Sequence, residues 1–192
     1  MNFIQKIFGN ICKFWFYKKK WKIANTLPPE IKKGVIVCGP HTSIWDGIFA
    51  SAAVFEQKIN INFAIKKELM FFPLGYFFKK IGGISIDRNK KVGDKKISSV
   101  EQISKIFDED KNIFLAISPE GTRKYNPNLK TGFYYIAKNA NVPIILAYLD
   151  YEKKEAGWGP IFEPSLEIDI VIKNVKSFYK NIHGKKKERG IY

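Results

Sequence analysis

The chain has 192 residues, of which 45% are apolar, and this is enough to enclose one hydrophobic core but hardly two. Its formal net charge of +15 calls for anionic partners, and both nucleic acids and membrane surfaces meet that requirement. Two cysteines without C-x-x-C spacing argue against a disulfide scaffold or a metal site, and the chain lacks the G-x-S-x-G and G-x-x-x-x-G-K-[ST] patterns of serine hydrolases and P-loop proteins.

Residues 1–26 are predicted to form an amphipathic segment on a membrane surface. Apolar residues recur at helical spacing from Ile4 to Trp15, and lysines between Lys6 and Lys20 supply positive charge. No stretch reaches the roughly 18 consecutive apolar residues that a spanning helix requires, and the start lacks a secretory signal. We therefore expect a peripheral or monotopic protein on the cytoplasmic face of a membrane.

Short apolar runs alternate with helix-like stretches along the rest of the chain. The predicted strands are residues 35–38, 61–65, 83–87, 113–117 and 143–149. This alternation predicts an α/β fold: a single domain over residues 27–180, with a mixed, mostly parallel sheet flanked by helices. Apolar positions between 94 and 107 predict one of these helices. The remaining residues, 181–192, are predicted to be a basic tail that is solvated and mobile.

His41 is the candidate for chemistry near neutral pH. The other histidine, His183, lies in the lysine-rich tail. His41 follows the 35–38 strand and precedes a predicted helix over 43–55, so Asp46 can reach back to fix the ring tautomer and leave the other nitrogen free to accept a proton. Ser43 and Asp46 also match a capping box, and the pair by itself favours that structural interpretation.

Two arginines are candidates for binding a phosphate group. Thr122 and Arg123 follow the turn Ser118–Gly121, where a hydroxyl, a guanidinium and free backbone amides can meet an anion. Arg88 ends the 83–87 strand and can deliver a second cation to the same rim. The alternatives are a solvated arginine at a turn for Arg123 and an edge-strand charge for Arg88.

An aromatic stretch over residues 71–78 is followed by two lysines. Such a segment can enter a membrane interface or line a channel for an acyl chain. It can equally form hydrophobic core beneath a proline turn, and the sequence leaves both interpretations open.

Taken together, these segments resemble the glycerolipid acyltransferase family, which includes the 1-acylglycerol-3-phosphate acyltransferases. The family pattern is H-x4-D, G-x-x-x-I-D-R, P-E-G-T-R and a V-P-I strand, in that order. The matching residues here are His41 to Asp46, Gly82 to Arg88, Pro119 to Arg123, and Val142 to Ile144. The resemblance extends over residues 34–150. Pro40 stands where many members have Asn, and Leu146 and Ala147 replace a second proline.

The resemblance implies transfer of a fatty acyl group from acyl-coenzyme A or acyl carrier protein to a lysolipid hydroxyl, with 1-acylglycerol-3-phosphate as acceptor and phosphatidate as product. It implies that His41 is the general base and Asp46 its partner. It also implies a phosphate site made by Arg88, Glu120, Gly121, Thr122 and Arg123. No cofactor, metal or nucleic-acid partner is expected, whereas an anionic membrane surface is. The alternatives are a phosphate-free acceptor such as a lyso-aminolipid, and a non-catalytic basic protein that docks on membranes or nucleic acid.

Overall fold

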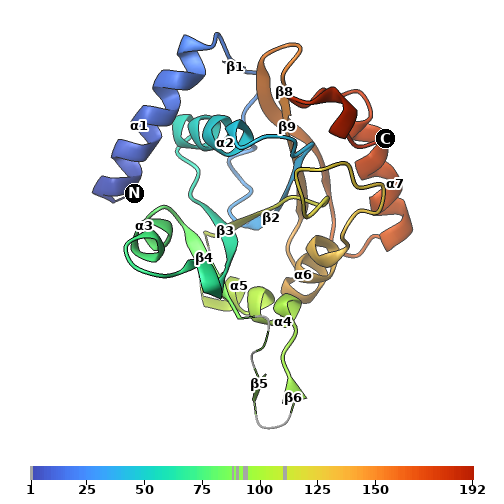
Figure 1. The fold of residues 1–192 in the computed structure, drawn as a ribbon. Coiled ribbons are helices and arrows are strands. Elements are labelled where there is room, and N and C mark those ends of the chain that lie inside the picture. The colour runs from blue at the N-terminus through green and yellow to red at the C-terminus, as the bar shows by residue number, and fades with distance from the viewer. Residues whose placement is uncertain (1, 88, 90, 93–94, 110–111) are drawn as a thin grey trace.

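A seven-stranded sheet runs through the middle of the molecule, with helices on both of its faces (Figure 1). The structure is a computed structural model that describes residues 2–192 except 88, 90, 93–94 and 110–111. The strand order is β1-β9-β8-β2-β7-β3-β4, and every neighbouring pair is parallel except β8 and β9. A separate antiparallel pair, β5 and β6, projects from the body of the domain. The predicted mixed, mostly parallel α/β fold is confirmed.

The elements have the following bounds. The strands are β1 Lys22–Ile23, β2 Gly34–Gly39, β3 Ile61–Lys66, β4 Gly83–Ile86, β5 Lys91–Val92, β6 Lys95–Lys96, β7 Phe114–Ile117, β8 Ile144–Asp150 and β9 Glu155–Phe162. The helices are α1 Phe3–Lys18, α2 Trp45–Glu56, α3 Leu74–Lys80, α4 Ser99–Ser104, α5 Ile106–Glu109, α6 Gly132–Ala140 and α7 Ile168–Tyr179, with single 3₁₀ turns at Lys67–Leu69 and Lys187–Arg189.

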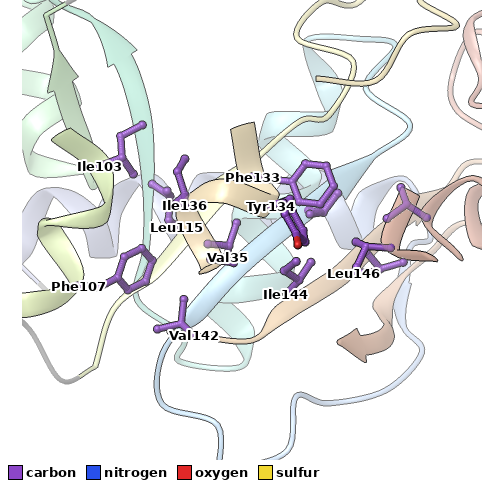
Figure 2. Close-up of a cluster of buried hydrophobic side chains, with 14 of the residues drawn as sticks. Val35, Ile103, Phe107, Leu115, Phe133, Tyr134, Ile136, Val142, Ile144 and Leu146 are labelled. Atoms are coloured by element: carbon purple, nitrogen blue, oxygen red, sulfur yellow. The ribbon is translucent and has the colours of Figure 1, made fainter. Parts of the chain in front are cut away.

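The central strand β2 is apolar on both faces because each face is covered by helices. Val35 and Val37 join residues of α4, α6 and α7 in the largest buried cluster. Figure 2 shows Val35 in this cluster with Leu115, Ile144 and Phe133. Ile36, the residue between the two valines, belongs to a cluster on the opposite face. The continuous apolar run of β2 therefore separates two cores.

The second helical layer consists of α1 and α2, which pack together on the other side of the sheet. Phe16 and Cys12 of α1 are 1% exposed and meet Phe49 of α2 in a cluster that also holds Trp21. The Trp21 and Phe49 rings lie 4.6 Å apart. One face of the predicted surface helix is thus part of the protein core, and only the other face is left to solvent.

Two features of the structure differ from the sequence prediction. The predicted helix over 94–107 is shorter, because Ser98 caps α4 at its start, and residues 95–96 form β6 instead. Residues 181–192, predicted to be a mobile tail, fold back against the domain: Ile191 is 2% exposed and belongs to the largest core cluster. The lysine side chains of this segment do remain exposed, as predicted.

Candidate active site

Three chain segments that follow neighbouring parallel strands meet at one edge of the sheet. His41 follows β2, Ser118 and Glu120 follow β7, and Tyr151 follows β8. Because β2 lies between β7 and β8, the carboxyl ends of these strands bring the three segments together. Ligands in open α/β folds bind at this edge of the sheet.

The Asp46 carboxylate lies at the centre of the cluster and accepts hydrogen bonds from four groups. Its Oδ2 atom is 3.1 Å from His41 Nδ1, 2.7 Å from Thr42 N and 2.8 Å from Ser43 N. Its Oδ1 atom accepts the Tyr151 hydroxyl at 2.6 Å. Oδ2 is a carboxylate oxygen that accepts both backbone N–H groups, and it can bond to His41 Nδ1 only if this nitrogen also donates. The contact therefore favours the imidazole tautomer with a proton on Nδ1 and a free lone pair on Nε2.

The contacts of Asp46 serve both interpretations of the sequence. The carboxylate binds the His41 ring, and it also holds the backbone of Thr42 and Ser43 at the start of α2. A reciprocal capping box does not form, because the Ser43 hydroxyl accepts from Trp45 N while Asp46 N donates to the Ser43 carbonyl. Asp46 therefore orients the histidine and fixes the loop that carries it.

Tyr151 is a member of the cluster that sequence analysis does not identify. It lies 105 positions from Asp46 and has no local pattern to mark it. Its ring packs against Trp21 with centroids 4.8 Å apart, in the core between α1 and α2. Burial and the hydrogen bond to Asp46 raise the pKa of Tyr151 well above its ordinary value, so the hydroxyl remains a donor.

Glu120 occupies a supporting position. Its side chain is buried, with 2% of the residue exposed, and its carboxylate accepts His41 N at 2.7 Å and the Ser118 hydroxyl at 2.7 Å. These contacts join the loop after β2 to the loop after β7. The family resemblance implies that Glu120 belongs to the phosphate site. Its carboxylate, however, is buried and carries the same sign of charge as a phosphate. Its physical role here is to hold the two loops together.

Two substitutions of Glu120 test how far its hydrogen bonds stabilise the protein. Glu120→Ala leaves two partly buried donors without an acceptor and is expected to lower the free energy of unfolding by about 2–4 kcal/mol. Glu120→Gln is expected to cost clearly less, because an amide can accept from His41 N and donate to the Ser118 hydroxyl. Urea unfolding of the three proteins measures this difference. Equal stability of the alanine variant and the wild type would contradict the role of Glu120.

Residues 121–123 form an exposed turn beside the histidine loop. Gly121 has φ +65°, a conformation that favours glycine, and Thr122 Oγ1 accepts from Lys124 N at 3.2 Å. The turn borders a hollow of about 350 Å³, here called the cationic pocket. Its lining residues are Thr42, Ser43, Ile44, Thr122, Arg123, Lys124, Lys186 and Arg189. Arg88, the other predicted phosphate ligand, lies outside the described residues.

A second hollow, here called the apolar cavity, begins at His41 and extends between the sheet and the layer of α1 and α2. Its volume is about 290 Å³. Its walls include Ile36, Cys38 and Ala147 from the sheet, Phe8 and Gly9 from α1, and Ala50, Ala53 and Val54 from α2. His41 thus lines the apolar cavity, while the next two residues of the chain line the cationic pocket.

Cys38 is the only thiol in the wall of the apolar cavity among the described residues. Loss of water contact, together with the negative charge of Glu120, raises the pKa of the Cys38 thiol to about 12. Since the thiolate is the nucleophilic form, this cysteine is inert near neutral pH. Cys38 is therefore not a candidate nucleophile for a reaction at this site.

The protein is thus an α/β protein whose sheet is covered by helices on both faces, with a histidine–carboxylate pair at the carboxyl end of the central strand that can carry proton-transfer chemistry. The model of the Acyltransferase family matches residues 19–149, which contain His41, Asp46 and the 119–123 loop, and the chain belongs to this family.

Two known proteins are similar to the chain. It is 33% identical over 101 residues to the 1-acyl-sn-glycerol-3-phosphate acyltransferase epsilon of Mus musculus, and the aligned part covers 51% of this chain and 27% of that protein. The chain therefore spans about a quarter of the length of this curated relative. The crystal structure of the 1-acyl-sn-glycerophosphate acyltransferase PlsC from Thermotoga maritima has the same fold, with a TM-score of 0.62 and 14% identity, over 91% of this chain and 76% of PlsC.

Proposed function

We propose that this protein transfers a fatty acyl group from an acyl thioester to the free hydroxyl of 1-acylglycerol-3-phosphate, giving phosphatidate. The observation that carries the proposal is that His41 lines the apolar cavity while Thr42 and Ser43, the next two residues, line the cationic pocket. The apolar cavity suits an acyl chain, and the cationic pocket suits a phosphate. The hydroxyl of a lysophosphatidate whose headgroup occupies the cationic pocket can then approach His41.

The reaction follows from the hydrogen bonds of His41. Its Nε2 accepts the proton of the acceptor hydroxyl as the oxygen attacks the thioester carbonyl carbon. The tetrahedral intermediate collapses, the carbon–sulfur bond breaks, and the thiolate leaves with the proton that His41 returns. Asp46 stabilises the transient imidazolium through Nδ1. Binding both substrates at one site adds the advantage of proximity.

The acyl donor in this proposal is acyl-coenzyme A or acyl carrier protein. Both carry the acyl group on a thioester, and the apolar cavity provides the same environment for the chain of either donor. The chain's positive charge attracts acidic acyl carrier protein and the phosphates of coenzyme A alike.

We further propose that the protein works at the cytoplasmic surface of a membrane. No helix among the described residues has the length and apolar content needed to cross a bilayer. Apolar side chains are exposed on α1 and on the turn before α3, namely Phe3, Ile7, Ile11, Phe14, Phe71 and Phe72. The Asn2 side chain joins α1 to α3 by donating to the Lys80 carbonyl at 2.9 Å.

Phe8 and Gly9 of α1 also line the apolar cavity. An acyl chain therefore has a short path from the lipid phase into this cavity.

Membrane docking is tested best by point substitutions, because deletion of α1 would uncover the core around Phe16. Ile7, Ile11 and Phe14 replaced together by serine are expected to weaken binding to vesicles with anionic lipid at least about tenfold, since each exposed side chain loses its contact with the lipid phase. Co-sedimentation measures the partition. The matched control is Tyr135, Ile161 and Ile170 replaced by serine, three exposed residues on other elements. Equal binding by both triple variants would refute docking through α1.

The activity itself is tested with purified protein in anionic vesicles, labelled acyl-coenzyme A or acyl carrier protein, lysophosphatidate, and a panel of phosphate-free lysolipids. Formation of labelled phosphatidate supports the proposal. Product from phosphate-free acceptors alone would retain the chemistry and refute the acceptor. Vesicle binding without product from any combination of acyl donor and acceptor would refute the enzymatic function and favour a docking protein.

A further inference from the structure

The C-terminal segment, residues 181–192, is held against the loop that carries His41. The His183 carbonyl accepts Tyr151 N at 2.8 Å, and Lys186 N donates to Thr42 Oγ1 at 3.3 Å. Gly184 fits directly under Thr42, since a Cβ atom at position 184 would lie 2.6 Å from Thr42 Cγ2. The segment therefore contacts two of the four residues that bond to the Asp46 carboxylate, namely Thr42 and Tyr151.

The end of the segment is anchored in the core. Ile191 packs beside Gly39 at the end of β2, where a Cβ on the glycine would lie 3.0 Å from Ile191 Cδ1. The same gap is bounded by Tyr179, whose hydroxyl donates to the Val37 and Ala147 carbonyls of two neighbouring strands. With Gly184 and Ile191 both fixed, the positions of the residues between them are also restricted.

This arrangement brings two more cations to the cationic pocket. Lys186 and Arg189 line it together with Arg123 and Lys124, and Arg189 Nη1 donates to the Arg123 carbonyl at 3.2 Å. No Asp or Glu among the described residues lines the pocket. The nearest carboxylate to Arg189 is that of its neighbour Glu188, at 3.7 Å and largely exposed. Four like charges around one hollow repel one another, and a bound anion relieves that repulsion.

We propose that Lys186 and Arg189 bind the acceptor's phosphate together with Arg123, so that the C-terminal segment forms part of the substrate site. This inference rests on the proposed acyl transfer. A phosphate at this site can come from the acceptor headgroup or from coenzyme A. The pocket's wall begins at Thr42, immediately after His41, and this favours the acceptor, whose hydroxyl has to reach the same histidine.

The run Lys185–Lys187 supplies a matched control. Lys185 lies over the Trp45 ring at 5.2 Å, and Lys187 pairs with Glu152 at 2.7 Å, so neither lines the pocket although each is adjacent to Lys186. The double variants Lys186→Gln/Arg189→Gln and Lys185→Gln/Lys187→Gln remove the same charge from the same segment. Only the first pair should affect the site.

Steady-state kinetics with a short-chain, monomeric lysophosphatidate and no vesicles exclude effects of membrane binding. The Lys186→Gln/Arg189→Gln variant is expected to raise the KM for this acceptor about tenfold, with kcat within about twofold and unchanged KM values for acyl-coenzyme A and for a phosphate-free lysolipid. Arg189→Lys is expected to retain most of the affinity.

An equal rise in KM in the control pair, or for the phosphate-free acceptor, would overturn the assignment of Lys186 and Arg189 to the phosphate site. A raised KM for acyl-coenzyme A alone would place the donor's phosphate in the pocket and overturn it as well.

Calorimetric binding of the same lysophosphatidate distinguishes this proposal from the proposed function. If the wild type transfers no acyl group, a loss of affinity in Lys186→Gln/Arg189→Gln but not in the control pair still supports the phosphate site. Equal affinity in both pairs would overturn it. The single variant Lys186→Gln is a control for misfolding. The Lys186 side chain is exposed and has no ion-pair partner among the described residues, so its replacement should leave the fold unchanged.

Discussion

His41→Ala is expected to lower kcat for acyl transfer by about 10²–10⁴-fold, the range that a positioned general base contributes. A lipid hydroxyl is a poor nucleophile until a base accepts its proton, and among the described residues only His41 combines an imidazole with a place in the apolar cavity. Turnover of labelled acyl-coenzyme A with lysophosphatidate measures the loss. The KM values should change much less, because the variant retains both hollows.

The alanine variant is expected to fold, and this makes the comparison clean. The His41 side chain is about one-third exposed, and the backbone N–H that donates to Glu120 is present in alanine. Vesicle binding and the thermal midpoint should therefore match those of the wild type. A clean preparation of His41→Ala that turns over at the wild-type rate would exclude the histidine as the base.

Asp46→Asn should produce the second large loss, also about 10²–10⁴-fold in kcat, because a neutral amide cannot stabilise the imidazolium that forms when His41 accepts a proton. Asp46 is 5% exposed, so its charge acts on the ring with little screening by water. The amide oxygen can still accept from Thr42 N and Ser43 N, which retains the loop. We therefore expect the rate to fall far more than stability does, as judged by kinetics and urea unfolding of the same preparations.

Tyr151→Phe is the control for Asp46, since it removes one donor from the carboxylate and leaves the contact with His41 intact. Its kcat is expected to fall by less than about tenfold. If Tyr151→Phe and Asp46→Asn lost activity equally, the tyrosine hydroxyl would take part in the reaction, and the role assigned to Asp46 alone would be wrong.

The sequence predicted best those elements whose signal is local. β2, β3, β4, β7 and β8 were recognised because each is a short apolar run, and parallel strands covered on both faces have that character. β9 was not recognised, because Gly157, Gly159 and Pro160 interrupt its pattern. It forms nevertheless, since it pairs with β8 in the antiparallel direction and Asn25 bonds the backbone of Trp158 at both N and O.

In the candidate site, too, the local contacts were predictable from the sequence and the long-range contacts were not. The approach of His41 to Asp46 was predictable from their spacing around a helix start, whereas the contact of Tyr151 with Asp46 depends on the pairing of β2 with β8. A run of three lysines indicated a solvated tail, and their side chains are indeed exposed. The fixed path of that segment comes from Gly184 and Ile191, two residues whose importance depends on what lies opposite them in the fold.

The pairing of β1 with β9 determines when a newly made chain can complete its site. Asn25 and Trp158 bond to each other across 133 residues, and Trp158 also lines the apolar cavity. At about 5–20 residues per second, the ribosome needs on the order of ten seconds to make the intervening chain. α1 and α2, which pack together, are both made before β9, so the apolar cavity that they line is completed late in synthesis.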